Sequence, residues 1–389
     1  MSSKSSLRMK IRPEEISNMK SHRFVGIDNS ILSKYVIRHY TKWLINKIPE
    51  SIAPNMLTLM GFAMMLLSLA LTLVFDPYLN NSPRFLALAN FLLMFGYFTC
   101  DNLDGAQARR TGSGSPLGQL FDHGVDSFSA LISSIALSSS LGLGISQNFL
   151  VLLLAIMIQF YIIGLEEKFT GQFVLGKVNG ASEGIALVLL LHLLSFVFGQ
   201  RIFQIMFSDV FLQSIKKVYM AVFRAESFQA ISVVMMTILI FNFFSTLYSI
   251  ESKMKLRRRI LLYVTLGRVM LFVASFIMLF NMLCSNDLWM RYLNILMFGE
   301  VFSIKYTCEV YSYVVKRECM MYMPVYLMYV GMSIIFSSGA IDVHKDLVLV
   351  LMFSVCSAYC GVSVYRIIET MTDVLGIEFL RIAPKSKKE

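Results

Sequence analysis

Residues 101–126 read DNLDGAQARRTGSGSPLGQLFDHGVD and contain four aspartates in two pairs. Asp101 and Asp104 are three residues apart, and Asp122 and Asp126 are four apart, so on a helix each pair shares one face. Four carboxylates that face one another repel strongly unless a cation lies between them. Oxygen ligands in this number suit Mg²⁺ or Mn²⁺, which commonly keep coordination positions open for substrate phosphates. The stretch therefore predicts a divalent metal site.

The segment between the two pairs, RRTGSGSP at residues 109–116, interrupts the helical pattern. Its two glycines and its proline, Gly112, Gly114 and Pro116, favour a turn. We therefore expect two antiparallel helices joined by this turn, each presenting two carboxylates near the same end.

The composition is that of a membrane protein. The chain has 389 residues, of which 56% are hydrophobic and only 15% are charged, and this balance favours an all-α, polytopic integral membrane protein. Apolar windows predict about ten transmembrane helices, near residues 55–75, 84–108, 117–142, 148–167, 182–199, 228–249, 260–284, 289–314, 320–338 and 346–374. The six cysteines show no pairing typical of a metal site or a disulfide framework.

The basic residues gather in alternate connections and before the first span, which accounts for the net charge of +10 without nucleic acid as a partner. By the positive-inside rule, both termini and the aspartates face the cytosol. Residues 31–47 carry an apolar stripe beside a basic one and predict an interfacial amphipathic helix. We expect a cytosolic N-terminal segment (1–54), a catalytic six-helix unit (55–250), and four further helices with a basic cytosolic tail (251–389).

The spacing D-x2-D-G-x2-A-R-x8-G-x3-D-x3-D resembles the signature of the CDP-alcohol phosphotransferase family. The eight fixed positions are filled by Asp101, Asp104, Gly105, Ala108, Arg109, Gly118, Asp122 and Asp126. A charged helix-turn-helix at a membrane surface would not need the two glycines and the alanine as well. A membrane transporter would show similar spans but would not need this array.

Further segments are similar to the eukaryotic choline and ethanolamine phosphotransferases of that family. They are APNMLT (53–58), ARRTGSGSPLGQLFDHG (108–124), FT (169–170), NGASEG (179–184) and the ending from residue 359 to 382. Three positions depart from that branch: Ala106, Gln119 and Ala181 stand where it usually has Lys, Glu and Pro. The departures put the substrate preference in doubt more than the reaction type.

The resemblance implies transfer of phosphocholine or phosphoethanolamine from CDP-choline or CDP-ethanolamine to diacylglycerol, with release of CMP, by a homodimer in the membrane. The alternative within the family is a phosphatidyltransferase that uses CDP-diacylglycerol as donor and attaches an alcohol such as inositol. Either reaction brings a soluble substrate and a lipid together at the end of membrane helices.

The metal roles follow from the four aspartates. Two divalent ions, Mg²⁺ or Mn²⁺, could bridge phosphate oxygens and stabilise the entering and leaving oxygens. Asp101 and Asp122, one from each helix, are expected to bridge both ions. Asp104 would complete one ion's ligand set and Asp126 the other.

Substrate contacts are expected from smaller and basic residues of the signature. Arg109 can hold phosphate through its planar fork, while Gly105, Ala108 and Gly118 lack bulk, which lets the nucleotide approach the backbone. By resemblance, Asn55 would also touch the nucleotide. Glu183, near the start of the fifth span, could orient a base or contact the headgroup, although an ordinary interfacial carboxylate is an equal alternative.

Two residues are candidates for the general base that takes the acceptor's proton. A carboxylate bound to a divalent cation is a weak base near neutral pH, which counts against Asp126. Histidine is better matched to the task, which favours His123. Hydrogen bonding of His123 to a carboxylate for packing alone remains the alternative.

The tail ends KSKKE, with lysines at 385 and 387. This pattern resembles a dilysine signal for the endoplasmic reticulum, although a basic tail is also expected from topology alone. The expected location is the endoplasmic reticulum membrane, with the active site facing the cytosol.

Overall fold

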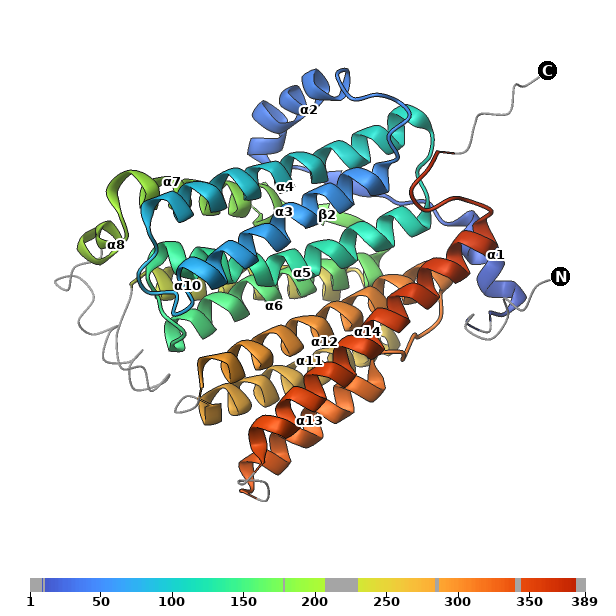
Figure 1. The fold of residues 1–389 in the computed structure, drawn as a ribbon. Helices are drawn as coiled ribbons and strands as arrows, with labels where there is room; N and C mark the ends of the chain where they lie inside the picture. The colour runs from blue at the N-terminus through green and yellow to red at the C-terminus, as the bar shows by residue number, and fades with distance from the viewer. Residues whose placement is uncertain are drawn as a thin grey trace.

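The computed structural model describes residues 9, 11–177, 179–206, 230–283, 287–339 and 344–382. The described chain is mostly helical, and its long helices run side by side (Figure 1). The expected dilysine pattern at 385 and 387 lies outside the described residues.

Four helices build the half of the molecule that contains the signature: α3 (Pro54–Phe75), α4 (Arg84–Thr111), α5 (Pro116–Leu141) and α6 (Gln147–Thr170). The expected turn lies between α4 and α5. Gly112 ends α4 in the left-handed conformation with φ 67°, which a glycine adopts without steric cost. Ser115 caps α5, its hydroxyl accepting a hydrogen bond from the backbone N–H of Gly118. The two signature helices therefore run antiparallel, as predicted.

The remaining helices follow the expected order. They are a π-helical turn η2 (Gly180–Gly184), α7 (Ile185–Phe198), α8 (Arg201–Met206), α10 (Ala230–Ser252), α11 (Leu256–Met282), α12 (Leu288–Val315), α13 (Met323–Ser337) and α14 (Lys345–Leu375).

A helix lies at each of the ten places where a span was expected. Six segments of the described chain are long and apolar enough to cross a membrane: α3, α4, α6, η2 with α7, most of α11, and α14. These segments make the chain a multi-pass membrane protein. The full count of ten spans stays a prediction.

Helix α12 packs against α5 and α6, and α14 crosses it on the other side (Figure 1). The approach to α6 is close at Gly164, where an added Cβ would lie 2.3 Å from the ring of Tyr306. On α5, Leu131 fills the space that a Cβ on Gly299 would need, with only 2.3 Å between them. The expected second group of helices thus contributes α12 directly to the core around the signature helices.

The N-terminal segment is more closely integrated than its polar sequence indicates. Helix α1 (Pro13–Ser21) packs on α12 and α14, with Glu15 paired to Arg317 at 2.6 Å. Strand β1 (Gly26–Asp28) pairs in parallel with β2 (Phe173–Leu175), so the all-α expectation missed one small two-stranded sheet. Residues 33–45 form the helical stretch η1 (Ser33–Ile37) and α2 (Arg38–Ile45), which packs on α4. Its interfacial placement stays a prediction.

Candidate active site

The four signature aspartates meet at one end of the α4–α5 pair. Asp101, Asp122 and Asp126 each offer a carboxylate oxygen, and these oxygens all lie within 4.8 Å of one another. Asp104 is buried beside them and accepts a hydrogen bond of 2.5 Å from the hydroxyl of Thr58 on α3. Its side chain also contacts that of Asp122. The predicted convergence of the two pairs is present in the structure.

This cluster fits a divalent cation by its own chemistry. The Oδ1 atom of Asp122 is buried and has no hydrogen-bond partner among the described residues. Across the same described ranges, no lysine or arginine forms an ion pair with any of the four carboxylates. Carboxylates in contact need a proton or a cation between them, and oxygen donors suit Mg²⁺ or Mn²⁺.

A tyrosine that the sequence interpretation missed joins the cluster. The hydroxyl of Tyr97 donates a hydrogen bond of 2.6 Å to Oδ1 of Asp126. Tyr97 lies one helical turn before Asp101 and on the same face of α4. This four-residue spacing was the available signal.

The two candidate bases have different surroundings. Asp126 belongs to the carboxylate cluster, whereas the Nδ1 atom of His123 lies 3.7 Å from Oε2 of Glu167 on α6. The imidazole also contacts Phe173 and Tyr306, with ring centroids 5.4 Å and 6.4 Å away. This separation is longer than a hydrogen bond, and Nδ1 of His123 is buried with no hydrogen-bond partner among the described residues, so Glu167 faces the imidazole without binding it in this structure.

Glu167 is itself held by a short chain of polar contacts. The side-chain amide of Gln119 donates a hydrogen bond of 2.5 Å to Oε1 of Glu167. The carbonyl oxygen of the same amide accepts a hydrogen bond of 2.9 Å from Nε2 of His22. The N-terminal segment thus reaches the candidate base through Gln119 and Glu167.

The expected substrate-binding residues of α4 lie along one end of the helix. Arg109 is exposed and folds back over Gly105, where an added Cβ would lie 3.4 Å from its Nη1 atom. Ala108 is half-buried. Its Cβ is 4.0 Å from the place where a Cβ added to Gly114 in the turn would lie. The guanidinium of Arg109 therefore stays available at the edge of the site.

Asn55 and Gly118 face each other across the α3–α5 boundary. A Cβ on Gly118 would lie 3.3 Å from Oδ1 of Asn55, so the glycine allows this close approach. Asn55 is one turn before Thr58, the partner of Asp104. The pair is therefore placed at the edge of the carboxylate cluster.

Glu183 has a structural role in the observed contacts. Its carboxylate accepts hydrogen bonds from the hydroxyl of Ser30 and the backbone N–H groups of Leu32 and Asn179, at 2.8–3.1 Å. Oε1 thus anchors the segment that leads into η1, and Oε2 binds Asn179, the residue that caps η2. The expected headgroup contact stays a prediction that no observed contact supports.

A sequence profile of the CDP-alcohol phosphatidyltransferases matches residues 51–304, well over half of the chain. The chain belongs to the CDP-alcohol phosphatidyltransferase family. Enzymes of this family generally depend on a divalent metal, in keeping with the carboxylate cluster. Their substrates are a CDP-alcohol and a lipid.

Two kinds of relative differ in how much of the chain they match. A CDP-diacylglycerol–serine O-phosphatidyltransferase of Encephalitozoon cuniculi is 54% identical over 381 residues, covering 98% of this chain and 99% of the relative. Choline/ethanolaminephosphotransferase 2 of Arabidopsis thaliana is 37% identical over 185 residues, only 47% of each chain. An uncharacterised family protein of Dictyostelium discoideum is 29% identical over 95% of this chain.

The expected choline or ethanolamine phosphotransferase activity is therefore wrong. The full-length match points to a different transferase of the family, and the aminoalcohol enzymes match only about half of the chain. The physical reason is that the signature reports what the family shares, which is displacement of CMP at a metal-bound pyrophosphate. Gln119, one of the three departures from the aminoalcohol pattern, lies within the site, where it binds Glu167.

Proposed function

We propose that this protein transfers the phosphatidyl group of CDP-diacylglycerol to the hydroxyl of L-serine, forming phosphatidylserine and releasing CMP. The observation that carries the proposal is the 54% identity to a serine phosphatidyltransferase over nearly the whole of both chains. The carboxylate cluster, which is suited to a metal-bound pyrophosphate, supports the same chemistry.

The reaction exchanges the phosphoanhydride bond of the donor for a phosphoester bond. The serine hydroxyl oxygen forms a bond to the phosphorus of the phosphatidyl group, and the bond from that phosphorus to the oxygen of CMP breaks. CMP leaves with the bonding electron pair, and the hydroxyl proton passes to a base of the protein. Positioning of the two substrates and neutralisation of the pyrophosphate charge should matter more than the base.

We infer that Asp101, Asp104, Asp122 and Asp126 hold Mg²⁺ or Mn²⁺ ions, two in number. Bound there, the ions would neutralise the pyrophosphate and stabilise the entering and leaving oxygens. Arg109 is positioned to bind a phosphate oxygen at the edge of the cluster. Tyr97 would hold the orientation of Asp126 through its hydrogen bond.

We assign the base to His123, with Asp126 as the alternative. The carboxylate of Glu167 beside Nδ1 would orient the imidazole and stabilise it once it has taken the proton. Asp126 is the weaker base because it shares a cluster suited to cations.

The membrane supplies the lipid donor. The diacyl chains of CDP-diacylglycerol would remain beside the apolar helices while its nucleotide reaches the carboxylates at their ends. We infer an endoplasmic reticulum location with this end in the cytosol, from the loop charges and the tail. The homodimer expected from the resemblance is open to native mass spectrometry in mild detergent.

The proposal is tested with the purified full-length chain in detergent, supplied with CDP-diacylglycerol, L-serine and Mn²⁺. CMP and phosphatidylserine should appear in equal amounts, and omission of serine should stop both. CMP release that is independent of serine, or that proceeds equally with inositol, would overturn the assignment of the acceptor. The Asp122→Asn variant provides the blank.

A further inference from the structure

The chain after α14 returns to the signature helices. Gly376, with φ 64°, ends α14 in the left-handed conformation, and residues 377–382 then leave the helix axis. Phe379 packs its ring edge-on against Phe121, with centroids 4.8 Å apart. Phe121 immediately precedes Asp122 of the carboxylate cluster. We call residues 377–382 the C-terminal segment.

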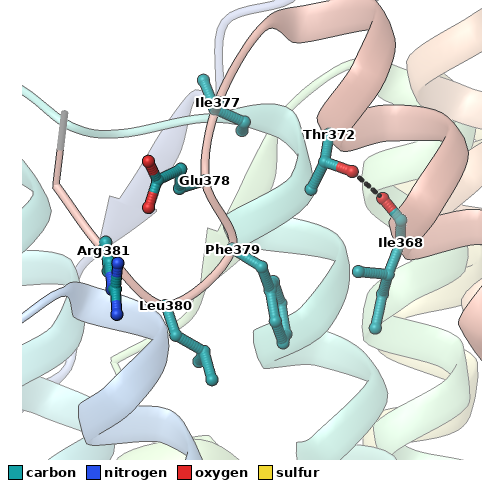
Figure 2. A pocket seen from close by; sticks show the side chains of 7 residues that line it. All are labelled: Ile368, Thr372, Ile377, Glu378, Phe379, Leu380 and Arg381. Atoms are coloured by element: carbon teal, nitrogen blue, oxygen red, sulfur yellow. Dashed lines mark hydrogen bonds between the residues drawn. The ribbon is translucent and has the colours of Figure 1, made fainter. Parts of the chain in front are cut away.

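The C-terminal segment is held by the site and stands away from its own helix. A cavity of about 460 Å³ is lined by Ile368, Thr372 and residues 377–381. Figure 2 shows the segment arching away from the last turns of α14, where Ile368 and Thr372 lie. The backbone N–H of Ile377 still donates a hydrogen bond of 3.2 Å to the carbonyl of Thr372, and beyond Ile377 the segment is anchored by Phe121 and Asn55.

The contact with Asn55 fixes the orientation of that side chain. Nδ2 of Asn55 donates a hydrogen bond of 2.8 Å to the backbone carbonyl of Phe379. A carbonyl oxygen can only accept, so the amide must turn its NH₂ group toward the segment. Its Oδ1 atom is then directed toward Gly118, where a Cβ would lie only 3.3 Å away.

We propose that the C-terminal segment is a positioning element for the nucleotide part of the donor, acting through the bond between Phe379 and Asn55. This rests on the proposed function, which supplies a CMP-containing donor. The segment touches the α3–α5 edge at Asn55 and Phe121, whereas His123 and Glu167 lie against α6. Loss of the segment should therefore weaken nucleotide binding and leave the serine KM unchanged.

The test compares two truncations of the full-length protein. One ends at Gly376 and lacks the segment; the matched control ends at Ile382 and lacks only residues 383–389. CMP affinity is measured by calorimetry with Mn²⁺ present, and KM is measured for each substrate. We expect the first truncation to weaken CMP binding and raise the donor KM by roughly threefold to tenfold, the scale of one hydrogen bond. The control should match the wild type.

A point variant tests the hydrogen bond between Asn55 and Phe379 without the wider structural effects that a truncation can have. Asn55→Asp keeps the shape of the side chain but replaces the NH₂ donor by an oxygen that the Phe379 carbonyl repels. It should weaken CMP binding at least as much as the truncation, and the two changes combined should cost little more than Asn55→Asp alone.

Three results would overturn the inference, and only the third would also affect the proposed function. Full CMP affinity in the truncated protein, or additive losses in the double variant, would remove the segment from nucleotide positioning while leaving the proposed function intact. A wild-type protein that binds no CMP would overturn both together.

Discussion

The side-chain amide of Gln119 on α5 donates a hydrogen bond of 2.5 Å to the carboxylate of Glu167 on α6. Oε2 of the same carboxylate lies 3.7 Å from Nδ1 of His123. Gln119 occupies a position where the aminoalcohol branch of the family usually has Glu. The side-chain amide of Gln119 can donate to Glu167, whereas an ionised Glu at this place could not.

Gln119→Glu should therefore reduce turnover at neutral pH, because two carboxylates would face each other and Glu167 would move away from His123. The loss should be about tenfold, the scale of a hydrogen bond to a charged group. The ratio of wild-type to variant turnover should be larger at alkaline pH, where both carboxylates are ionised, than at acidic pH, where one of them carries a proton. The control for charge alone is Gln172→Glu, which adds the same charge at an exposed position directly before β2. A pH-independent loss would contradict this explanation.

Asp101→Asn and Asp122→Asn should each abolish turnover. Each removes a carboxylate from the cluster whose oxygens lie within 4.8 Å of one another. Both should also reduce the Mn²⁺ bound at equilibrium, measured by elemental analysis after desalting. Asp346→Asn, at the opposite end of α14 from the C-terminal segment, should change neither quantity. Retained turnover of more than about a tenth in either cluster variant would be incompatible with essential metal ligands.

His123→Ala should lose about 10²-fold in kcat, the usual scale for removal of a general base. Mn²⁺ binding should persist, since His123 lies against Glu167 and outside the carboxylate group. The comparison is Asp126→Asn, measured in the same two ways. Near-normal kcat in His123→Ala, together with inactive Asp126→Asn that still binds metal, would assign the base to Asp126.

Glu309→Gln should destabilise the fold strongly. Glu309 on α12 is buried and accepts from Lys168 at 2.5 Å and from Lys305 at 3.0 Å, so its loss leaves two ammonium groups without that charge. Breaking a buried ion pair costs about 3–5 kcal/mol. Glu318→Gln is the matched control, because Glu318 pairs with the same Lys168 from an exposed position. A similar fall in thermal midpoint for both variants, measured in one detergent, would contradict the special role of the buried pair.

Hydropathy and spacing predicted the helices and the carboxylate cluster well, because both are local properties. A long apolar window forms a helix wherever it lies, and the three- and four-residue spacings place Asp101 with Asp104 and Asp122 with Asp126. The turn between them was predicted from Gly112, Gly114 and Pro116, and the cap at Ser115 was seen only in the structure. Only the orientation of α4 and α5 toward each other required the tertiary structure.

Contacts between distant segments were not predictable in the same way. The pairing of Gly26 with Phe173 joins two strands of three residues each, too short for a strand pattern to stand out. The anchoring of Asn55 by Phe379 spans 324 residues. The expected aminoalcohol activity was wrong because the signature is common to the whole family and does not distinguish its members by substrate.

The central claim is tested most directly by competition between substrate pairs on one purified sample. CDP-diacylglycerol with isotopically labelled serine and CDP-ethanolamine with diacylglycerol are supplied together with Mn²⁺, and the lipid products are separated by mass spectrometry. The account predicts labelled phosphatidylserine in molar balance with CMP, and no phosphatidylethanolamine above the Asp122→Asn blank. Phosphatidylethanolamine as the main product, without labelled phosphatidylserine, would contradict it.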